Sequence, residues 1–159
     1  VGKTWVMNEL IRQHKIKIRG RIGMFRFHYT KDVVFLGKYD GSTFEGSDKL
    51  SMAIMRDLPM YKRWSNNADV ITIAEGDRFM NNKYIDEMNP IIIRILGDGE
   101  EGRIKRGSNQ TERHLKAIST RINNIVKDRQ VVSIESSQEC VKFINKQIDE
   151  RRKLQKVTR

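Results

Sequence analysis

The sequence is poor in cysteine, in proline and in long apolar runs. Its single cysteine, Cys140, cannot form a disulfide within the chain, so we expect a reducing compartment such as the cytoplasm, with Cys140 buried on a helix. The longest apolar runs, such as PIIIRIL, are far too short to cross a bilayer, so no membrane partner is expected. Only Pro59 and Pro90 occur, neither in a linker-like stretch, and the 159 residues are therefore expected to form one domain.

Acidic residues are scarce relative to basic ones. The chain has 20 Asp and Glu residues against 31 Lys and Arg residues, which gives a formal net charge of +11. This excess favours a polyanionic partner, either nucleic acid or a phosphorylated ligand. The alternative is a generally basic surface without a specific partner, and part of the excess lies in the C-terminal DERRKLQKVTR, which can be a solvated helix end.

Hydrophobic patterning predicts that helices and strands alternate along the chain. Helices are expected in KTWVMNELIRQH, SDKLSMAIMRDLPMYKRW, NNKYIDEMN, QTERHLKAISTRINNIVKDR and SQECVKFINKQIDERRKLQK, and strands in GMFRFHYT, DVVFLGKYD, ADVITIAEGDRF, PIIIRILGDG and VVSIES. The first two strands can pair as a hairpin, or the second can be a central strand. The alternation predicts an α/β fold, with a parallel sheet between helices on both faces and ligands beyond the carboxyl ends of its strands.

The opening GKT is the back half of a phosphate-binding loop of the form G-x-x-x-x-G-K-[ST]. Such a loop directs backbone N–H groups and a helix N-terminus at phosphate, with a lysine on the outer phosphates and a hydroxyl on magnesium. Gly2, Lys3 and Thr4 can supply these groups. The preceding strand and the first glycine are then expected before Val1, so the N-terminal strand is missing from this chain.

Two further stretches place carboxylates at the ends of predicted strands. In TIAEGDRF, Glu75 or Asp77 can hold magnesium, and the alternative is a helix cap or a salt bridge with Arg78. In LGKYDGSTFEGSDKLS, Asp40 can take the proton of an acceptor hydroxyl, with Asp48 as the second choice. Asp48, or Ser47 beside it, can equally cap the following helix.

The stretch LGKYDGSTFEGSDKLS also offers aromatic rings that can bind a ligand, and GRIKRGSNQTERHLKAISTR offers cations. Tyr39 and Phe44 are candidates for stacking on a base. Cations from a mobile loop can close over a transferring phosphate, and the alternative is a solvated basic face. These cations are Arg103, Lys105 and Arg106 in a Gly-bounded loop, followed by Arg113, Lys116 and Arg121 on a predicted helix.

The three histidines offer no site of their own. His14, His28 and His114 have no Cys or His partner at the spacing of metal ligands. We expect each to be an ordinary surface or core residue. The sequence also has no nucleophile elbow and no Ser-His-Asp pattern.

Taken together, these stretches resemble P-loop kinases of the nucleoside and nucleotide kinase group. The match runs from GKTW through AEGDRF to RIKRGSNQTERHLK, where that group has its lid. More narrowly, LGKYDGSTFEGSDKLSMA and RGSNQTERHLKAISTRINNI resemble segments of small bacteriophage kinases, including kinases of 5-hydroxymethyluracil in DNA. The chain departs from the group in lacking the first half of the P-loop and in ending its acidic strand as EGD.

The resemblance implies that residues 1–159 are a single P-loop kinase-like domain, truncated within the P-loop, with a lid at 103–113. The implied activity is transfer of the ATP γ-phosphate to a hydroxyl on a DNA base, such as 5-hydroxymethyluracil, or on a nucleotide, in the cytoplasm of a host cell if the protein is from a phage. The implied site combines Gly2, Lys3 and Thr4 for ATP, Thr4 with Glu75 or Asp77 for Mg²⁺, Asp40 or Asp48 for the acceptor, and Arg103, Arg106 and Arg113 for the transferring phosphate.

Three other functions share some of these features. A free deoxynucleotide kinase has the same parts but does not need a charge of +11. A P-loop ATPase that acts on DNA without phosphorylating it explains the charge but not the acceptor loop. A non-enzymatic nucleic-acid-binding protein explains the charge but leaves the acidic strand ends without a role.

Overall fold

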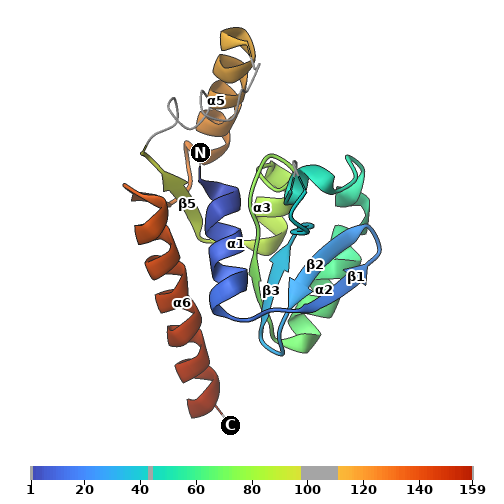
Figure 1. Ribbon diagram of the computed structural model, residues 1–159. Coiled ribbons are helices and arrows are strands. Elements are labelled where there is room, and N and C mark those ends of the chain that lie inside the picture. Colours follow the sequence, from blue (N-terminus) through green and yellow to red (C-terminus); the bar gives the residue numbers. More distant parts are fainter. Residues whose placement is uncertain (1, 43–44, 98–110, 159) are drawn as a thin grey trace.

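The computed structural model describes residues 2–42, 45–97 and 111–158 (Figure 1). The helices are α1 (Lys3–Gln13), α2 (Leu58–Ala68), α3 (Asn82–Met88), α5 (Glu112–Val126) and α6 (Ser137–Val157). The strands are β1 (Ile18–Ile22), β2 (Phe25–Tyr29), β3 (Val33–Leu36), β4 (Ile71–Ile73), β5 (Ile92–Ile95) and β6 (Val131–Ile134). The chain is therefore a mixed α/β protein, and every predicted strand and all but one of the predicted helices form close to the expected positions.

The strands form two sheets. The larger has the order β1-β2-β3-β4, in which β1 and β2, and β2 and β3, are antiparallel while β3 and β4 are parallel. The smaller is the parallel pair β5-β6. The prediction of one parallel sheet is wrong, because β2 pairs antiparallel with both β1 and β3, and β5 and β6 lie in a sheet of their own within the described residues. A tight turn at Gly23, with φ of 56°, adds the unpredicted strand β1.

Strand β3 is covered by helices on both faces. Val33 and Phe35 lie in a core cluster with residues of α1 and α6, whereas Val34 and Leu36 lie in a second cluster with residues of α2. All four side chains are completely buried, and each contributes roughly 1.5–3 kcal/mol through burial. β3 thus pairs with β2 as a hairpin and is also a central strand, so both alternatives left open by the sequence are realised.

The helix predicted from Ser47 onward begins only at Leu58. Two short 3₁₀ turns, Ser47–Lys49 and Ile54–Asp57, precede it. Pro59 lies in the first turn of α2, where a backbone N–H has no partner within the helix and its absence costs nothing. In an α-helix that ran from Ser47 through Pro59, the proline ring would clash with the carbonyl group one turn earlier. Neither Ser47 nor Asp48 caps a helix, because Gly46 is the N-cap of the first turn and Asp57 that of α2.

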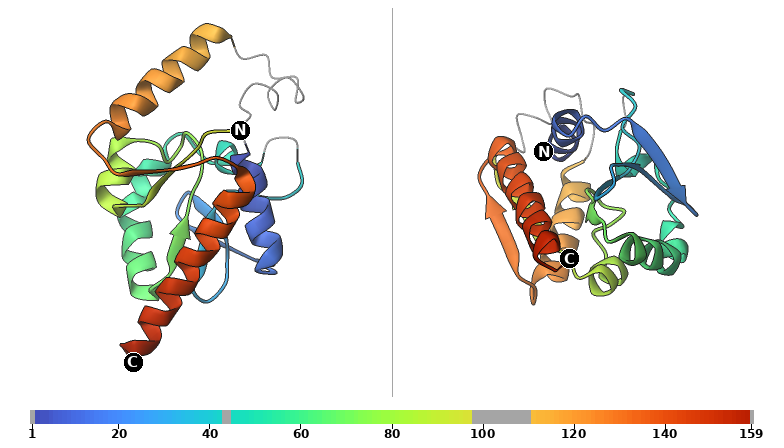
Figure 2. Two further views of the ribbon diagram at one scale, coloured as in Figure 1. Left: turned by 90° about the vertical axis from the view of Figure 1, so that its left-hand side faces the viewer. Right: turned by 90° about the horizontal axis from the view of Figure 1, so that it is seen from below.

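The helices α1 and α6 pack side by side, and α5 projects from the body (Figures 1 and 2). Cys140 is buried on α6, as expected, and burial raises the pKa of its thiol. Among the helices of the described residues, none is long and apolar enough to cross a membrane.

Candidate active site

The start of α1 lies against the carboxyl end of β6. Gly2 is the N-cap of α1 and has a left-handed backbone, with φ of 87°. A Cβ atom at this position would lie 2.0 Å from Oγ of Ser137, so only glycine permits the approach to the start of α6. No side chain in the described ranges caps this end of α1, and its first turn has no acidic residue, which leaves backbone N–H groups able to bind an anion.

Glu75 follows β4 and lies within range of the positive charge of Lys3, although the two side chains form no ion pair in the described residues. Its Oε1 accepts a hydrogen bond from the hydroxyl of Tyr39 at 3.3 Å, and the backbone N–H of Ser47 also donates to its carboxylate. Burial raises the pKa of Glu75, and the positive charge of the nearby Lys3 partly opposes that rise. The structure therefore brings together a lysine and a carboxylate that are 72 positions apart in sequence and that the sequence assigned to one site.

Two glycines allow the loops after β3 and β4 to interlock around Glu75. A Cβ at Gly46 would lie 2.2 Å from Oε1 of Glu75, and one at Gly76 would lie 2.3 Å from Oγ of Ser47. Gly46 and Gly76 also have positive φ values of 86° and 84°, which residues other than glycine rarely adopt. The missing side chain of Gly46 therefore leaves room for the carboxylate of Glu75, and its backbone also shapes a turn.

The two candidate proton acceptors occupy different surroundings. Oδ1 of Asp40 accepts hydrogen bonds from the hydroxyl of Ser42 at 2.6 Å and from its backbone N–H at 3.2 Å, and these bonds lower the pKa of this exposed carboxyl. Asp48 is also exposed, but its negative charge contributes to raising the pKa values of Glu75 and Tyr39. Asp48 is therefore the candidate that lies near the Lys3–Glu75 pair.

Sequence analysis did not identify Glu45, which ties the same loop to α1. Its Oε2 accepts a hydrogen bond from Nδ2 of Asn8 at 2.6 Å, and the backbone N–H of Gly41 donates to its Oε1. Neither residue stands in a motif, so no local signal marks them. Tyr39, predicted to stack on a base, is instead 6% exposed and hydrogen-bonded, and Phe44 lies outside the described residues.

Asp77 is engaged with α5. It forms an ion pair with Arg121 at 3.2 Å, and both side chains are about half exposed. Arg78, the partner expected from the sequence, instead donates from Nε to the backbone oxygen of Leu50 at 3.3 Å. Of the two acidic residues predicted after β4, Glu75 is thus the one that lies within range of the charge of Lys3.

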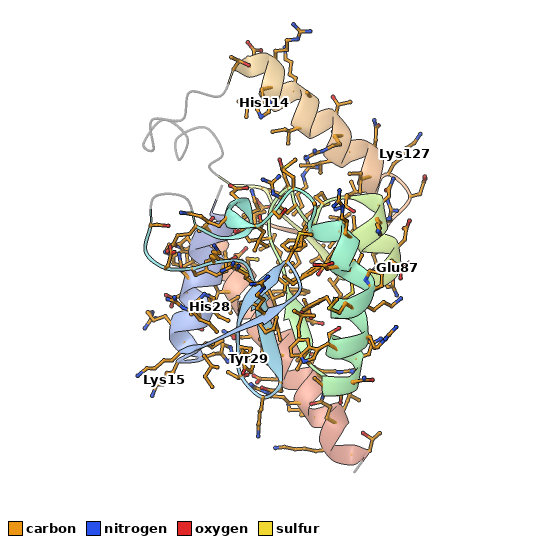
Figure 3. All side chains as sticks on the ribbon, turned by 90° about the vertical axis from the view of Figure 1, so that its right-hand side faces the viewer. Lys15, His28, Tyr29, Glu87, His114 and Lys127 are labelled. Atoms are coloured by element: carbon orange, nitrogen blue, oxygen red, sulfur yellow. The ribbon has the colours of Figure 1, made fainter. Side chains whose placement is uncertain are left out.

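The predicted lid is described only in part. Arg103 and Arg106 lie outside the described residues. Arg113 is exposed on the first turn of α5, which is the outer end of this helix, as the positions of His114 and Lys127 show (Figure 3). The cation that α5 brings to the loop after β4 is Arg121.

The donor set near Lys3 is suited to magnesium. Mg²⁺ in nucleotide sites is held by one or two protein oxygens together with waters and phosphates, and the hydroxyl of Thr4 and the carboxylate of Glu75 are groups of this kind. Groups of three or more His, Cys, Asp or Glu residues that could hold a metal by themselves are not found in the described residues. His28 is buried and accepts a hydrogen bond from the backbone N–H of Tyr39, which makes it the core histidine that the sequence predicted.

Comparison with known proteins gave no match. No family model matches the chain, and neither the curated proteins nor the solved structures contain a significant relative. Its function must therefore be inferred from the side chains gathered at the start of α1.

Proposed function

We propose that the protein is an ATP-dependent phosphotransferase of the P-loop kinase type, whose acceptor is a hydroxyl on a DNA base, such as 5-hydroxymethyluracil in DNA, or on a nucleotide. One observation carries the proposal: Lys3 lies on the first turn of a helix without a capping side chain in the described residues, and its charge acts on the partly buried carboxylate of Glu75. A lysine, an uncapped helix N-terminus and a carboxylate at a strand end are the groups that bind the phosphates and magnesium of ATP.

The residues divide the chemistry as follows. Lys3 and the N–H groups of α1 bind the phosphates, while Thr4 and Glu75 would hold Mg²⁺, which neutralises negative charge on them. The acceptor oxygen bonds to the γ-phosphorus as the bond to the bridging oxygen of ADP breaks, and Asp48 takes the hydroxyl proton. Arg113 and the arginines at 103 and 106 remain candidates for neutralising the transferring phosphate.

A P-loop fold also requires a strand between β4 and β5. Within the described residues β4 pairs only with β3, and β5 only with β6. Ile73 and Ile95, from the two sheets, pack on the same core cluster with α1 and α6, while β1–β2 and β6 lie on opposite sides of the molecule (Figure 2). We propose that a hydrophobic strand before Val1 pairs with β4 and β5 and that its loop to Gly2 completes the phosphate site.

The parent gene tests this part of the proposal. It should encode a hydrophobic strand and a glycine roughly four to six residues before Val1. If the residues before Val1 contain neither, nucleotide binding through this loop is refuted, because much of the phosphate cradle is absent.

The activity itself is tested by transfer of labelled γ-phosphate from ATP. The acceptors are free deoxynucleotides, single-stranded DNA and duplex DNA containing 5-hydroxymethyluracil, and the protein includes the segment before Val1. Transfer to mononucleotides alone would identify a free deoxynucleotide kinase. DNA binding without transfer would identify a P-loop ATPase that acts on DNA if ATP is hydrolysed, and a non-enzymatic binding protein if it is not.

Lys3→Ala supplies the matched test of mechanism. It should lower the transfer rate by roughly 10²-fold or more, because an electrostatic stabiliser of the transferring phosphate is lost. Lys153→Ala removes an exposed lysine from α6 and should leave the rate unchanged. Wild-type activity in Lys3→Ala would refute the P-loop mechanism.

A further inference from the structure

The ribbon formed by β1 and β2 presents three arginines on one face. Arg21 lies directly opposite Arg26 in the antiparallel register, and Arg19 lies opposite His28 two positions along the same face. All three arginines are exposed. We call Arg19, Arg21 and Arg26 the ribbon face.

The opposite side of the ribbon packs against the core, and on the arginine side only His28, opposite Arg19, is buried, while the three arginines remain exposed. Phe25 and Phe27 are buried in the cluster that includes α2. Gly20 faces Phe27, and a Cβ there would lie 2.3 Å from its ring, so the absence of a side chain lets the ring pack. Because side chains alternate along a strand, a shift of register that buried the arginines would expose these phenylalanines.

The arginines of the ribbon face differ from other surface arginines in their partners among the described residues. Elsewhere on the surface arginines do pair with carboxylates, as Arg151 does with Asp69 and Arg129 with Asp86. In the part of the chain that the structure describes, the three arginines of the ribbon face take part in no ion pair, and Arg21 donates only to the backbone oxygen of Gly23, at 2.7 Å.

Repulsion between the arginines of the ribbon face raises the free energy of the folded state, and a bound anion would relieve this repulsion. Like charges directly opposite each other on neighbouring strands are destabilising, and Arg21 and Arg26 form this kind of pair. Guanidinium groups bind phosphate through two parallel N–H bonds, which a lysine cannot do. Arg19 and Arg21 are about 7 Å apart along the strand, so the two guanidinium groups can reach different phosphates of one DNA strand.

We propose that the ribbon face binds the phosphate backbone of duplex DNA. Duplex is favoured over single-stranded DNA because surfaces for single strands combine cations with exposed aromatic rings, and the rings of this ribbon lie on its buried side. The bound duplex would run beside the loop after β3 that carries Asp40 and Asp48. This loop begins at Gly37, whose backbone N–H donates to the backbone oxygen of Arg26 at 2.8 Å. The surface stands independently of phosphoryl transfer.

The test is a titration of a fluorescent duplex of about 20 base pairs at several salt concentrations. Each lost phosphate contact lowers the slope of log K against log salt by roughly 0.9, so Arg21→Ala/Arg26→Ala should lower it by roughly 1.8. Its affinity at low salt should fall at least about tenfold, since each contact is a charged hydrogen bond. The control Lys142→Ala/Lys153→Ala removes the same charge from α6 and should keep the wild-type slope.

Several results would overturn the proposal. These are an unchanged slope in the arginine variant, an equal loss in the lysine control, tighter binding of single-stranded DNA than of duplex, or binding of anionic lipid vesicles without binding of DNA. Arg21→Lys/Arg26→Lys retains the charge and should keep most of the slope. Thermal unfolding checks the fold: the alanine variant should melt no lower than wild type, because a repulsive pair has been removed. Transfer to a free nucleotide is measured beside it and should not change, which separates this surface from the proposed enzyme activity.

Discussion

Replacing Glu75 by glutamine should stabilise the protein at neutral pH and change its stability little near pH 4. Burial raises the pKa of Glu75 in the folded state above the value it has in the unfolded chain. A carboxyl of this kind contributes its full stability below the unfolded pKa, and that contribution is lost as the pH rises through the folded pKa. Glutamine does not titrate and its oxygen can still accept the hydrogen bond from Tyr39, so it escapes this loss.

The size of the effect follows from the linkage between pKa and stability. Each unit by which the folded pKa exceeds the unfolded one costs the charged form about 1.4 kcal/mol. For a chain of this length, each such unit corresponds to a rise in Tm of roughly 3–6 °C for the variant at pH 8, with almost no difference at pH 4. Against a total stability of roughly 5–15 kcal/mol, such a change is readily measured by thermal unfolding monitored by circular dichroism.

Glu87→Gln is the matched control with the opposite sign. A hydrogen bond from Lys62, at 2.8 Å, and the charge of this lysine lower the pKa of Glu87. Its contribution is therefore present above the unfolded pKa and is lost as the pH falls through the folded pKa, so Glu87→Gln should be the less stable protein at pH 8. If Glu75→Gln is no more stable than wild type at pH 8, or if its advantage is the same at pH 4, burial does not penalise the charge of Glu75 as inferred.

Two other substitutions test the packing around the site and the core. Gly46→Ala should lower the urea midpoint more than Gly41→Ala. Both glycines have a positive φ, which is unfavourable for alanine, but Gly46 combines it with a ψ of −142° and only there does the added Cβ meet the carboxylate of Glu75, whereas nothing lies within 4 Å at Gly41. Equal losses would mean that the carboxylate moves away freely. Tyr61→Phe should cost about 1–2 kcal/mol in urea unfolding, because it removes a hydrogen bond of 2.7 Å to Oγ1 of Thr72 and leaves that hydroxyl without it; an unchanged midpoint would show that the bond adds nothing.

Local patterning predicted most elements but not how the strands pair. The apolar run at Ile92–Ile95 and the amphipathic spacing of Glu112–Val126 contain enough information to identify a strand and a helix. The segment Ile18–Ile22 does not, because its arginines and Gly20 resemble a loop until the register with β2 places them on an outer face. Sheet order depends on contacts between distant residues, and periodicity within one segment does not encode these.

The same distinction applies to the site. Lys3 and Glu75 could be assigned together because each stands at a recognisable boundary, the start of a helix and the end of a strand. The contact of Tyr39 with Glu75 could not, since it arises from the way two loops close over each other. Likewise, the sequence favoured Asp40 over Asp48, and only the fold places the charge of Asp48 near Glu75.

The geometry at the start of α1 links completion of the sheet to completion of the proposed phosphate site. Gly2 approaches Ser137, three positions after the end of β6, and the charge of Lys3 acts on Glu75, two positions after the end of β4, so the segments that follow the two sheets meet there. A strand that pairs with β4 and β5 and runs parallel to them must end at this point, and the loop that follows it must lead to Gly2. An extended protein with the strand intact but the glycine of the loop replaced should therefore gain stability without binding ATP. Extension that restores ATP binding without raising the Tm would contradict this arrangement.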